Sequence, residues 1–172
     1  MKNRTKTKKK IAKGKKKKVV MVSGGFDPIH IGHVRMIQEA KRLGDKLVVV
    51  INNDNWLRAK KGKEFMPEQE RKEIIEAIIG VDEVVISSHP KNPKDMSVSR
   101  ELIKIKPNIF ANGGDRNEKD ANDPKSSLYK ERKIHKKLGI EMAYNVGRGG
   151  KIRSSSELLK EYTKKISTVD KG

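Results

Sequence analysis

The 172-residue chain contains no cysteine. Disulfide bonds and thiolate metal sites are therefore excluded. Apolar runs are short: none approaches the roughly 18–20 residues that a membrane-spanning helix needs, and KVVMV is too short for the core of a signal peptide. We expect a soluble, cytoplasmic protein that makes no membrane contact. Aromatic residues are scarce and scattered, at three Phe, three Tyr and one Trp, so no stacking platform for single-stranded nucleic acid is indicated.

Acidic residues are outnumbered by basic ones, and the formal net charge is +19. Residues 1–18 carry eleven Lys or Arg and no acid, which leaves +8 on the remainder. We interpret residues 1–17 as a disordered basic tail and residues 18–172 as one domain. The tail is interpreted as a solubilising segment or a weak contact with nucleic acid or another polyanion. Tethering to a specific nucleic acid or the ribosome, and a targeting signal, are the alternatives.

Downstream of the tail, short apolar runs alternate with segments of helical periodicity. The Val/Ile runs are unbroken, as is typical of strands buried on both faces. This alternation predicts a Rossmann-like α/β fold, a doubly wound five-stranded parallel sheet with helices on both sides. Ligands of such sheets bind beyond the carboxyl ends of the strands. The predicted strands are 18–24, 45–54, 82–88, 108–114 and 140–147, and the predicted helices are 33–44, 68–80, 97–107, 126–139 and 154–166.

Two histidines stand three residues apart in SGGFDPIHIGH (residues 23–33), where the first predicted strand gives way to a helix. A helix N-terminus presents unpaired N–H groups and a partial positive charge, so it binds anions. His30 and His33 would lie on the same side of the first turn, and Gly32 lets a phosphate approach the backbone closely. The pattern predicts a triphosphate site. Zinc is disfavoured, because the spacing is not that of a zincin helix and no further His or Cys supports it.

SGGFDPIHIGH resembles the signature G-x-F-D-x-x-H-x-G-H of the cytidylyltransferase-like nucleotidylyltransferases. Four further segments resemble the same family, in the family's order. The likeness is greatest to heptose-phosphate adenylyltransferases and then to glycerol-3-phosphate cytidylyltransferases, and archaeal FAD synthetases are also similar. The further segments are RLGDKLVVVINNDNWLRAKKG, PEQERKEIIEAIIGVDEVV, IFANGGDR and RSSSELL.

The resemblance implies a magnesium-dependent enzyme that transfers a nucleoside monophosphate from an NTP to a small phosphorylated acceptor and releases pyrophosphate. ATP is favoured over CTP because NGGDR resembles the heptose-type segment, and a phosphorylated sugar or polyol is the expected acceptor. The alternatives are a CTP-dependent glycerol-3-phosphate-type enzyme and an FAD-synthetase-like adenylyltransferase. Relatives of this kind also suggest a homodimer.

The resemblance also assigns roles to individual residues, with none of them ligating a metal. The implied catalytic residues are His30, His33 and Lys61; the implied nucleotide-binding residues are Gly25, Phe26, Asp27, Gly32, Gly113, Gly114, Asp115, Ser154, Ser155 and Ser156; and the implied acceptor-binding residues are Arg58, Lys60 and Arg71.

The same residues allow other interpretations of the protein's function. HIGH, at residues 30–33, is also the signature of class I aminoacyl-tRNA synthetases, but this length leaves no room for an anticodon-binding domain. A non-catalytic basic nucleic-acid-binding protein on the same fold is the alternative of a different class. Within the preferred interpretation, either Arg148 or Arg153 could reach the nucleotide. The polar segment 115–125 could be a lid or a simple loop.

Overall fold

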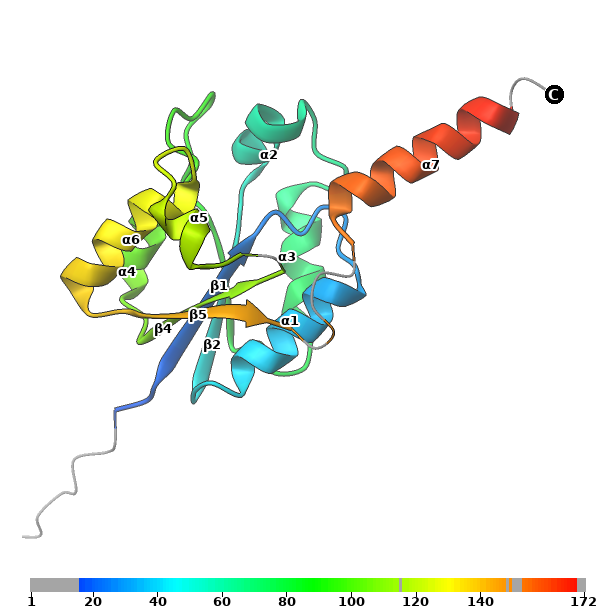
Figure 1. The fold of residues 1–172 in the computed structure, drawn as a ribbon. Helices are drawn as coiled ribbons and strands as arrows, with labels where there is room; N and C mark the ends of the chain where they lie inside the picture. Colours follow the sequence, from blue (N-terminus) through cyan, green and yellow to red (C-terminus); the bar gives the residue numbers. More distant parts are fainter. Residues whose placement is uncertain (1–15, 115, 148, 150–152, 170–172) are drawn as a thin grey trace, which may run out of the picture.

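Five parallel strands form one sheet in the order β3-β2-β1-β4-β5 (Figure 1). The computed structural model describes residues 16–114, 116–147, 149 and 153–169. β1 lies at the centre, between β2 and β4. The chain leaves β3 at one edge and crosses to the far side of β1, so a topological switch point lies at the carboxyl ends of β1 and β4. The strands are β1 (Val19–Gly24), β2 (Lys46–Ile51), β3 (Glu83–Ile86), β4 (Ile109–Gly113) and β5 (Glu141–Val146).

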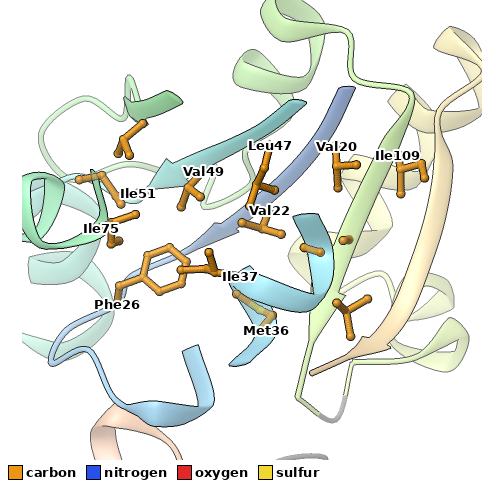
Figure 2. Packing of buried hydrophobic residues seen from close by; sticks show 14 residues of the cluster. Val20, Val22, Phe26, Met36, Ile37, Leu47, Val49, Ile51, Ile75 and Ile109 are labelled. Atoms are coloured by element: carbon orange, nitrogen blue, oxygen red, sulfur yellow. The ribbon is translucent and has the colours of Figure 1, made fainter. Parts of the chain in front are cut away.

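Helices cover both faces of this sheet. Val20 and Val22 of β1 belong to a hydrophobic cluster that Ile37 of the first helix helps to fill (Figure 2). Met21, between them, belongs to a second cluster with Leu128 of the sixth helix. Because alternate residues of β1 are buried on opposite faces, the strand appears in the sequence as one continuous apolar run. The helices are α1 (Ile31–Lys41), α2 (Asp54–Lys61), α3 (Glu68–Glu76), α4 (Ser99–Ile105), α5 (Glu118–Asn122), α6 (Ser127–Leu138) and α7 (Ser155–Val169).

The predicted doubly wound parallel sheet is confirmed, while the helices differ more from expectation. α1 begins two residues earlier than predicted, at Ile31, because His30 caps it. α2 occupies a segment for which no helix was predicted, although Asn53 caps its start and Gly62 its end. α5 lies inside the polar segment 115–125, which was expected to be irregular.

The expected basic tail lies mostly outside the described residues. Lys16 and Lys17 are described and exposed, and β1 begins at Val19. Within the part of the chain that the structure describes, no helix is long and apolar enough to cross a membrane.

Arg71 of α3 clamps the loops at the carboxyl edge of the sheet, with only 1% of its surface exposed. Nη1 donates to the carbonyl groups of Gly25 (2.8 Å) and Asn52 (2.7 Å), and Nε donates to that of Met66 (2.9 Å). Nη2 pairs with the Asp54 carboxylate at 2.6 Å. The expected role in binding acceptor phosphate is therefore corrected, because this guanidinium is buried and its donors bind protein groups. Arg71 instead ties together the ends of β1 and β2 and the start of α2.

Replacing Arg71 with alanine should lower the free energy of unfolding by about 3–5 kcal/mol, because it removes one partner of a buried ion pair and leaves carbonyl groups without donors. Denaturant titration followed by circular dichroism measures the change. Arg58→Ala is the matched control, since Arg58 is exposed and its pair with Glu64 should contribute less than about 1 kcal/mol. An Arg71→Ala variant as stable as this control would contradict the clamp.

Candidate active site

A cleft crosses the carboxyl edge of the sheet, over the switch point between β1 and β4. Segments far apart in the chain form it, and Figure 1 shows the start of α7 beside the loop that joins β1 to α1. Asp27, Arg58 and Arg71 do not line the cleft, and Asp115 lies outside the described residues. The sequence-predicted residues that line it are Gly25, Phe26, His30, Gly32, His33, Lys60, Lys61, Gly113, Gly114, Ser154, Ser155 and Ser156.

His30 and His33 cap the N-terminus of α1 reciprocally. Nδ1 of His30 accepts the Gly32 N–H at 3.1 Å, and Nδ1 of His33 accepts the His30 N–H at 3.3 Å. An accepting Nδ1 carries no proton, so each neutral ring holds its proton on Nε2. The rings stack with their centroids 3.7 Å apart. Nε2 of His30 is buried and has no hydrogen-bond partner among the described residues. The pair therefore supplies two Nε2–H donors beside a helix N-terminus.

Gly32 is required by the His30 cap. A Cβ at position 32 would lie 2.9 Å from Cε1 and 3.0 Å from Nδ1 of the His30 ring, closer than packed carbon atoms normally approach. This steric requirement adds to the predicted one, the close approach of a phosphate. Phe26 supports the pair from the other side, because its buried ring meets His33 edge-on at a centroid distance of 5.0 Å.

Burial lowers the pKa of both imidazoles. The pKa of His33 falls to about 3, because burial and then the proximity of His30 and Lys61 disfavour its cationic form. Burial also lowers the pKa of His30. Two stacked imidazolium ions would repel each other, so the stack also favours neutral rings. Near pH 7 the histidines therefore act as neutral hydrogen-bond donors, and any cationic charge at the cleft must come from other groups.

Lys61, the last residue of α2, reaches back to the loop between β1 and α1. Its Nζ donates to the Asp27 carbonyl at 2.7 Å, and burial lowers its pKa. The buried Asp27 carboxylate accepts the N–H groups of Phe65 and Met66, each at 2.8 Å. Asp27 was expected to bind nucleotide by shaping its loop, and the structure shows only the shaping role. It anchors the segment after α2 while Lys61 lines the cleft.

Lys60 and Arg58 have different surroundings although both lie on α2. Lys60 lines the cleft, and its Nζ stands 4.5 Å from the centroid of the Trp56 ring, a cation–π geometry. Burial lowers its pKa. Arg58 does not line the cleft, and its Nε and Nη2 bind the Glu64 carboxylate at 2.8 and 2.6 Å. Its expected acceptor-binding role stays a prediction.

The serine run places the N-terminus of α7 at the same cleft. Ser155 donates its hydroxyl to the Pro28 carbonyl at 2.9 Å, which fixes α7 to the histidine loop. The Ser154 N–H donates to the Glu157 carboxylate at 2.6 Å, and the Glu157 N–H donates to Ser154 Oγ at 3.2 Å. This reciprocal cap makes the serines a helix start. Two helix N-termini, those of α1 and α7, therefore adjoin one site that suits anions.

The end of β4 contributes glycine for packing as well as for access. A Cβ at Gly113 would collide with Met36 of α1 and lie 3.0 Å from the Val146 carbonyl. Of the two arginines that could reach a nucleotide, Arg153 lines the cleft. Arg148 lies outside the described residues.

One wall of the cleft was not predicted from the sequence. Trp56, Met96, Val98 and Leu128 line it, together with Glu131. Val98 and Leu128 belong to the cluster on the α4 and α6 side of the sheet, whereas α1 covers the other side. A local signal existed for part of this wall, since Leu128 and Glu131 stand three residues apart on a predicted helix and so share one side of it.

The imidazole protonation states can be checked by NMR titration of the ¹⁵N-labelled protein. In the absence of ligand, His33 should stay neutral and Nε2-protonated down to about pH 4, because burial holds its pKa near 3. The lowered pKa values also predict that stability declines as pH falls below about 6.5, where the unfolded chain gains protons that the folded histidines do not. A His33 midpoint at or above pH 6.5 would contradict the buried neutral pair.

Comparison with known proteins connects this geometry to a family. Residues 21–168 match the family model described as Cytidylyltransferase-like. The chain is 39% identical over 98 residues to the FAD synthase of Ferroglobus placidus, covering 57% of this chain and 60% of that protein. It is 38% identical over 101 residues to the bifunctional protein HldE of Koribacter versatilis, covering 57% of this chain and 19% of that protein. The aligned segment thus spans less than two thirds of either relative.

A solved structure shows the same relationship across a larger share of the chain. The lipopolysaccharide core biosynthesis protein of Thermoplasma volcanium superposes with a TM-score of 0.57 and 29% identity, covering 75% of this chain and 94% of that protein. These relationships confirm the predicted enzyme class, a nucleotidyltransferase. By its sequence match and by its fold, the chain belongs to the cytidylyltransferase-like family.

Proposed function

We propose that the protein is an adenylyltransferase, which transfers AMP from ATP to the phosphate of an acceptor and releases pyrophosphate. The reciprocal histidine cap carries this proposal, because it supplies two fixed N–H donors where two helix N-termini adjoin one cleft. The FAD synthase and HldE relatives support transfer of an adenylyl group rather than a cytidylyl group.

In the proposed reaction, an oxygen of the acceptor phosphate forms a bond to the α-phosphorus of ATP. The bond from the α-phosphorus to the bridging oxygen breaks, and that oxygen leaves with pyrophosphate. The acceptor phosphate is already anionic at pH 7, so no general base is required. Catalysis then depends on positioning and on electrostatic stabilisation of the transferred group.

The two sides of the cleft suit different parts of the substrates. The triphosphate fits the side formed by the starts of α1 and α7, where His30, His33 and Ser156 line the cleft. Lys61 is suited to neutralise the negative charge where the acceptor phosphate meets the α-phosphate. Its Nζ lies beside the histidines, because it is hydrogen-bonded to the Asp27 carbonyl in the loop that precedes them. The acceptor body then lies toward the apolar wall.

Magnesium is proposed to arrive with the nucleotide. Among the described residues, no group of three His, Asp or Glu side chains is placed to hold a metal ion. Mg²⁺ commonly keeps several waters and binds substrate phosphates. The described lining therefore does not fit a resident metal centre, and the roles proposed for its side chains do not depend on one.

We propose FMN as the acceptor, with FAD as the product. The FAD synthase relative supports this choice. So does the wall of Trp56, Met96, Val98 and Leu128, because apolar side chains suit a flat aromatic ring better than a hydrated sugar. A phosphorylated sugar or polyol is the second candidate, which the HldE relative favours.

An acceptor screen tests the proposal directly. The protein is incubated with ATP or CTP and with FMN, sugar phosphates or polyol phosphates, and pyrophosphate release and product mass are measured. ATP with FMN should yield FAD. Well-folded protein that turns over no pair would contradict an adenylyltransferase, and tight, salt-sensitive binding of nucleic acid without turnover would favour the non-catalytic alternative.

His33→Ala should lower the rate by roughly 10²–10³, because it removes a preorganised donor to charge that develops as pyrophosphate leaves. The loss should appear mainly in kcat rather than in KM for ATP. The melting temperature should fall only modestly, since the variant loses one capping hydrogen bond and the ring contacts with His30 and Phe26. His135→Ala is the matched control: His135 is buried against Phe110 outside the cleft, so its loss should lower the melting temperature and spare kcat. The reverse pattern would make His33 structural.

Gly32→Ala should displace the His30 donor while both imidazoles remain. The added Cβ would displace the His30 ring, from which it would stand 2.9 Å, and the kcat should fall by about tenfold or more. Stability should hold, because alanine is favoured over glycine in a helix. Steady-state kinetics and thermal melting measure both effects, with the exposed neighbour Ile31→Ala as the control. Full activity in Gly32→Ala would show that catalysis does not need this cap.

A further inference from the structure

Glu131 is a buried acid with too few partners. It lies on α6 with 4% of its surface exposed. One carboxyl oxygen, Oε1, accepts the Val98 N–H at 3.0 Å. Among the described residues it forms no ion pair, and no second hydrogen bond to its carboxyl group is present. A buried carboxylate normally requires several donors or a cation, so this group is incompletely satisfied by the protein itself.

Glu101 shows how the same fold satisfies an acid that has a structural role. It lies on α4 and is 5% exposed, almost as buried as Glu131. Its Oε1 accepts both the N–H and the hydroxyl of Ser88, each at 2.8 Å. Glu101 does not line the cleft, whereas Glu131 does. The two acids therefore differ in two features: Glu101 receives two donors and lies outside the cleft, whereas Glu131 receives one donor and lies on the cleft.

We propose that Glu131 binds the acceptor, by accepting a hydrogen bond from an N–H or O–H group of the acceptor body. This inference rests on the proposed function, which places an acceptor in the cleft. The position of Glu131 supports it, because the neighbouring lining residues Val98 and Leu128 belong to the cluster on the α4 and α6 side of the sheet, whereas α1 covers the other side. A carboxylate there is kept apart from the triphosphate, which it would repel.

The electrostatics of the site agree with this assignment. Burial raises the pKa of Glu131 to about 7, although the Val98 N–H and the nearby Arg116 favour its charged form and Asp95 opposes it. A donor from the acceptor would stabilise the carboxylate that burial disfavours. In FMN the ring imide N–H and the ribityl hydroxyls are such donors, and in a sugar phosphate the hydroxyls are. Glu131 would recognise the same kind of group in FMN and in a sugar phosphate, namely a hydrogen-bond donor that is not part of the phosphate.

The test compares Glu131→Gln with Glu101→Gln in the acceptor assay. In Glu131→Gln the new amide oxygen would accept the Val98 N–H, which would turn the amide N–H₂ group toward the donor of the acceptor. KM for the acceptor should rise roughly 10- to 100-fold, as expected for losing one hydrogen bond to a charged group, while kcat and KM for ATP stay within about twofold. Glu101→Gln should lower the melting temperature and leave KM for the acceptor unchanged. Glu131→Asp, which keeps the charge but shortens the side chain, should raise KM for the acceptor as well.

The outcomes separate this inference from the proposed function. An unchanged KM for the acceptor in both Glu131 variants would overturn the inference, and a rise in KM for ATP instead would assign Glu131 to the nucleotide. FMN binding, followed by its fluorescence without ATP, does not require turnover. If the wild-type protein turns over no acceptor but Glu131→Gln still loses FMN affinity, the proposed reaction fails and Glu131 stands as a binding residue. If FMN does not bind to the wild type, the same comparison is made with the sugar phosphates by calorimetry, and absence of binding there overturns the inference.

Discussion

Hydrogen bonds from two backbone N–H groups to two imidazoles determine the chemistry of this cleft. His30 and His33 each use Nδ1 to accept from the first turn of α1, which fixes the tautomer and leaves Nε2–H as a donor. A serine or aspartate cap would satisfy the same backbone groups, but it would leave no such pair of ring donors beyond the helix. Burial keeps the rings neutral, so they can stack closely without repulsion. In the proposed reaction, the same side chains therefore begin a helix and bind phosphate.

The cap depends on a loop that is held in place by side chains from other helices. Arg71 binds the Gly25 carbonyl from one side, and Lys61 binds the Asp27 carbonyl from the end of α2. Ser155 binds the Pro28 carbonyl from the start of α7. Three carbonyl groups of one loop are thus tied to three different helices. Phe26, between the first two of them, keeps a positive φ of 50°, a conformation that the surroundings must enforce. These hydrogen bonds, from residues far away in the sequence, hold the loop that positions the histidine donors.

The sequence was informative wherever the signal was local. Unbroken apolar runs predicted the parallel sheet, because strands buried on both faces, such as β1 and β2, need apolar residues at successive positions. The histidine spacing predicted a site at a helix start. Arg71 could not be assigned in the same way, because a guanidinium beside phosphate-binding segments suits carbonyl groups as well as phosphate, and only its burial distinguishes the two. The apolar wall was missed because Trp56, Val98 and Leu128 come from three separate elements whose meeting is a long-range feature. The helix α2 had usable caps in Asn53 and Gly62, but no helix was predicted there.

In the proposed reaction, the groups that line the cleft give its two substrates an order in space. Helix N-termini and Lys61 make one side favourable to anions, while the wall of Trp56, Met96, Val98 and Leu128 is mainly apolar, with one buried acid, Glu131, and the cations Lys60 and Arg116 beside it. A triphosphate placed beside Glu131 would lose the imidazole and helix N-terminal donors, and an uncharged ring placed on the donor side would leave the imidazole N–H groups unpaired. Exchanging the two substrates would therefore leave polar groups unsatisfied on both sides of the cleft. The acceptor phosphate, which is anionic at one end of an otherwise different molecule, is then drawn toward Lys61, where the two substrates meet. In this arrangement the charged groups of the cleft align the two substrates, and such alignment is what a reaction without a general base requires.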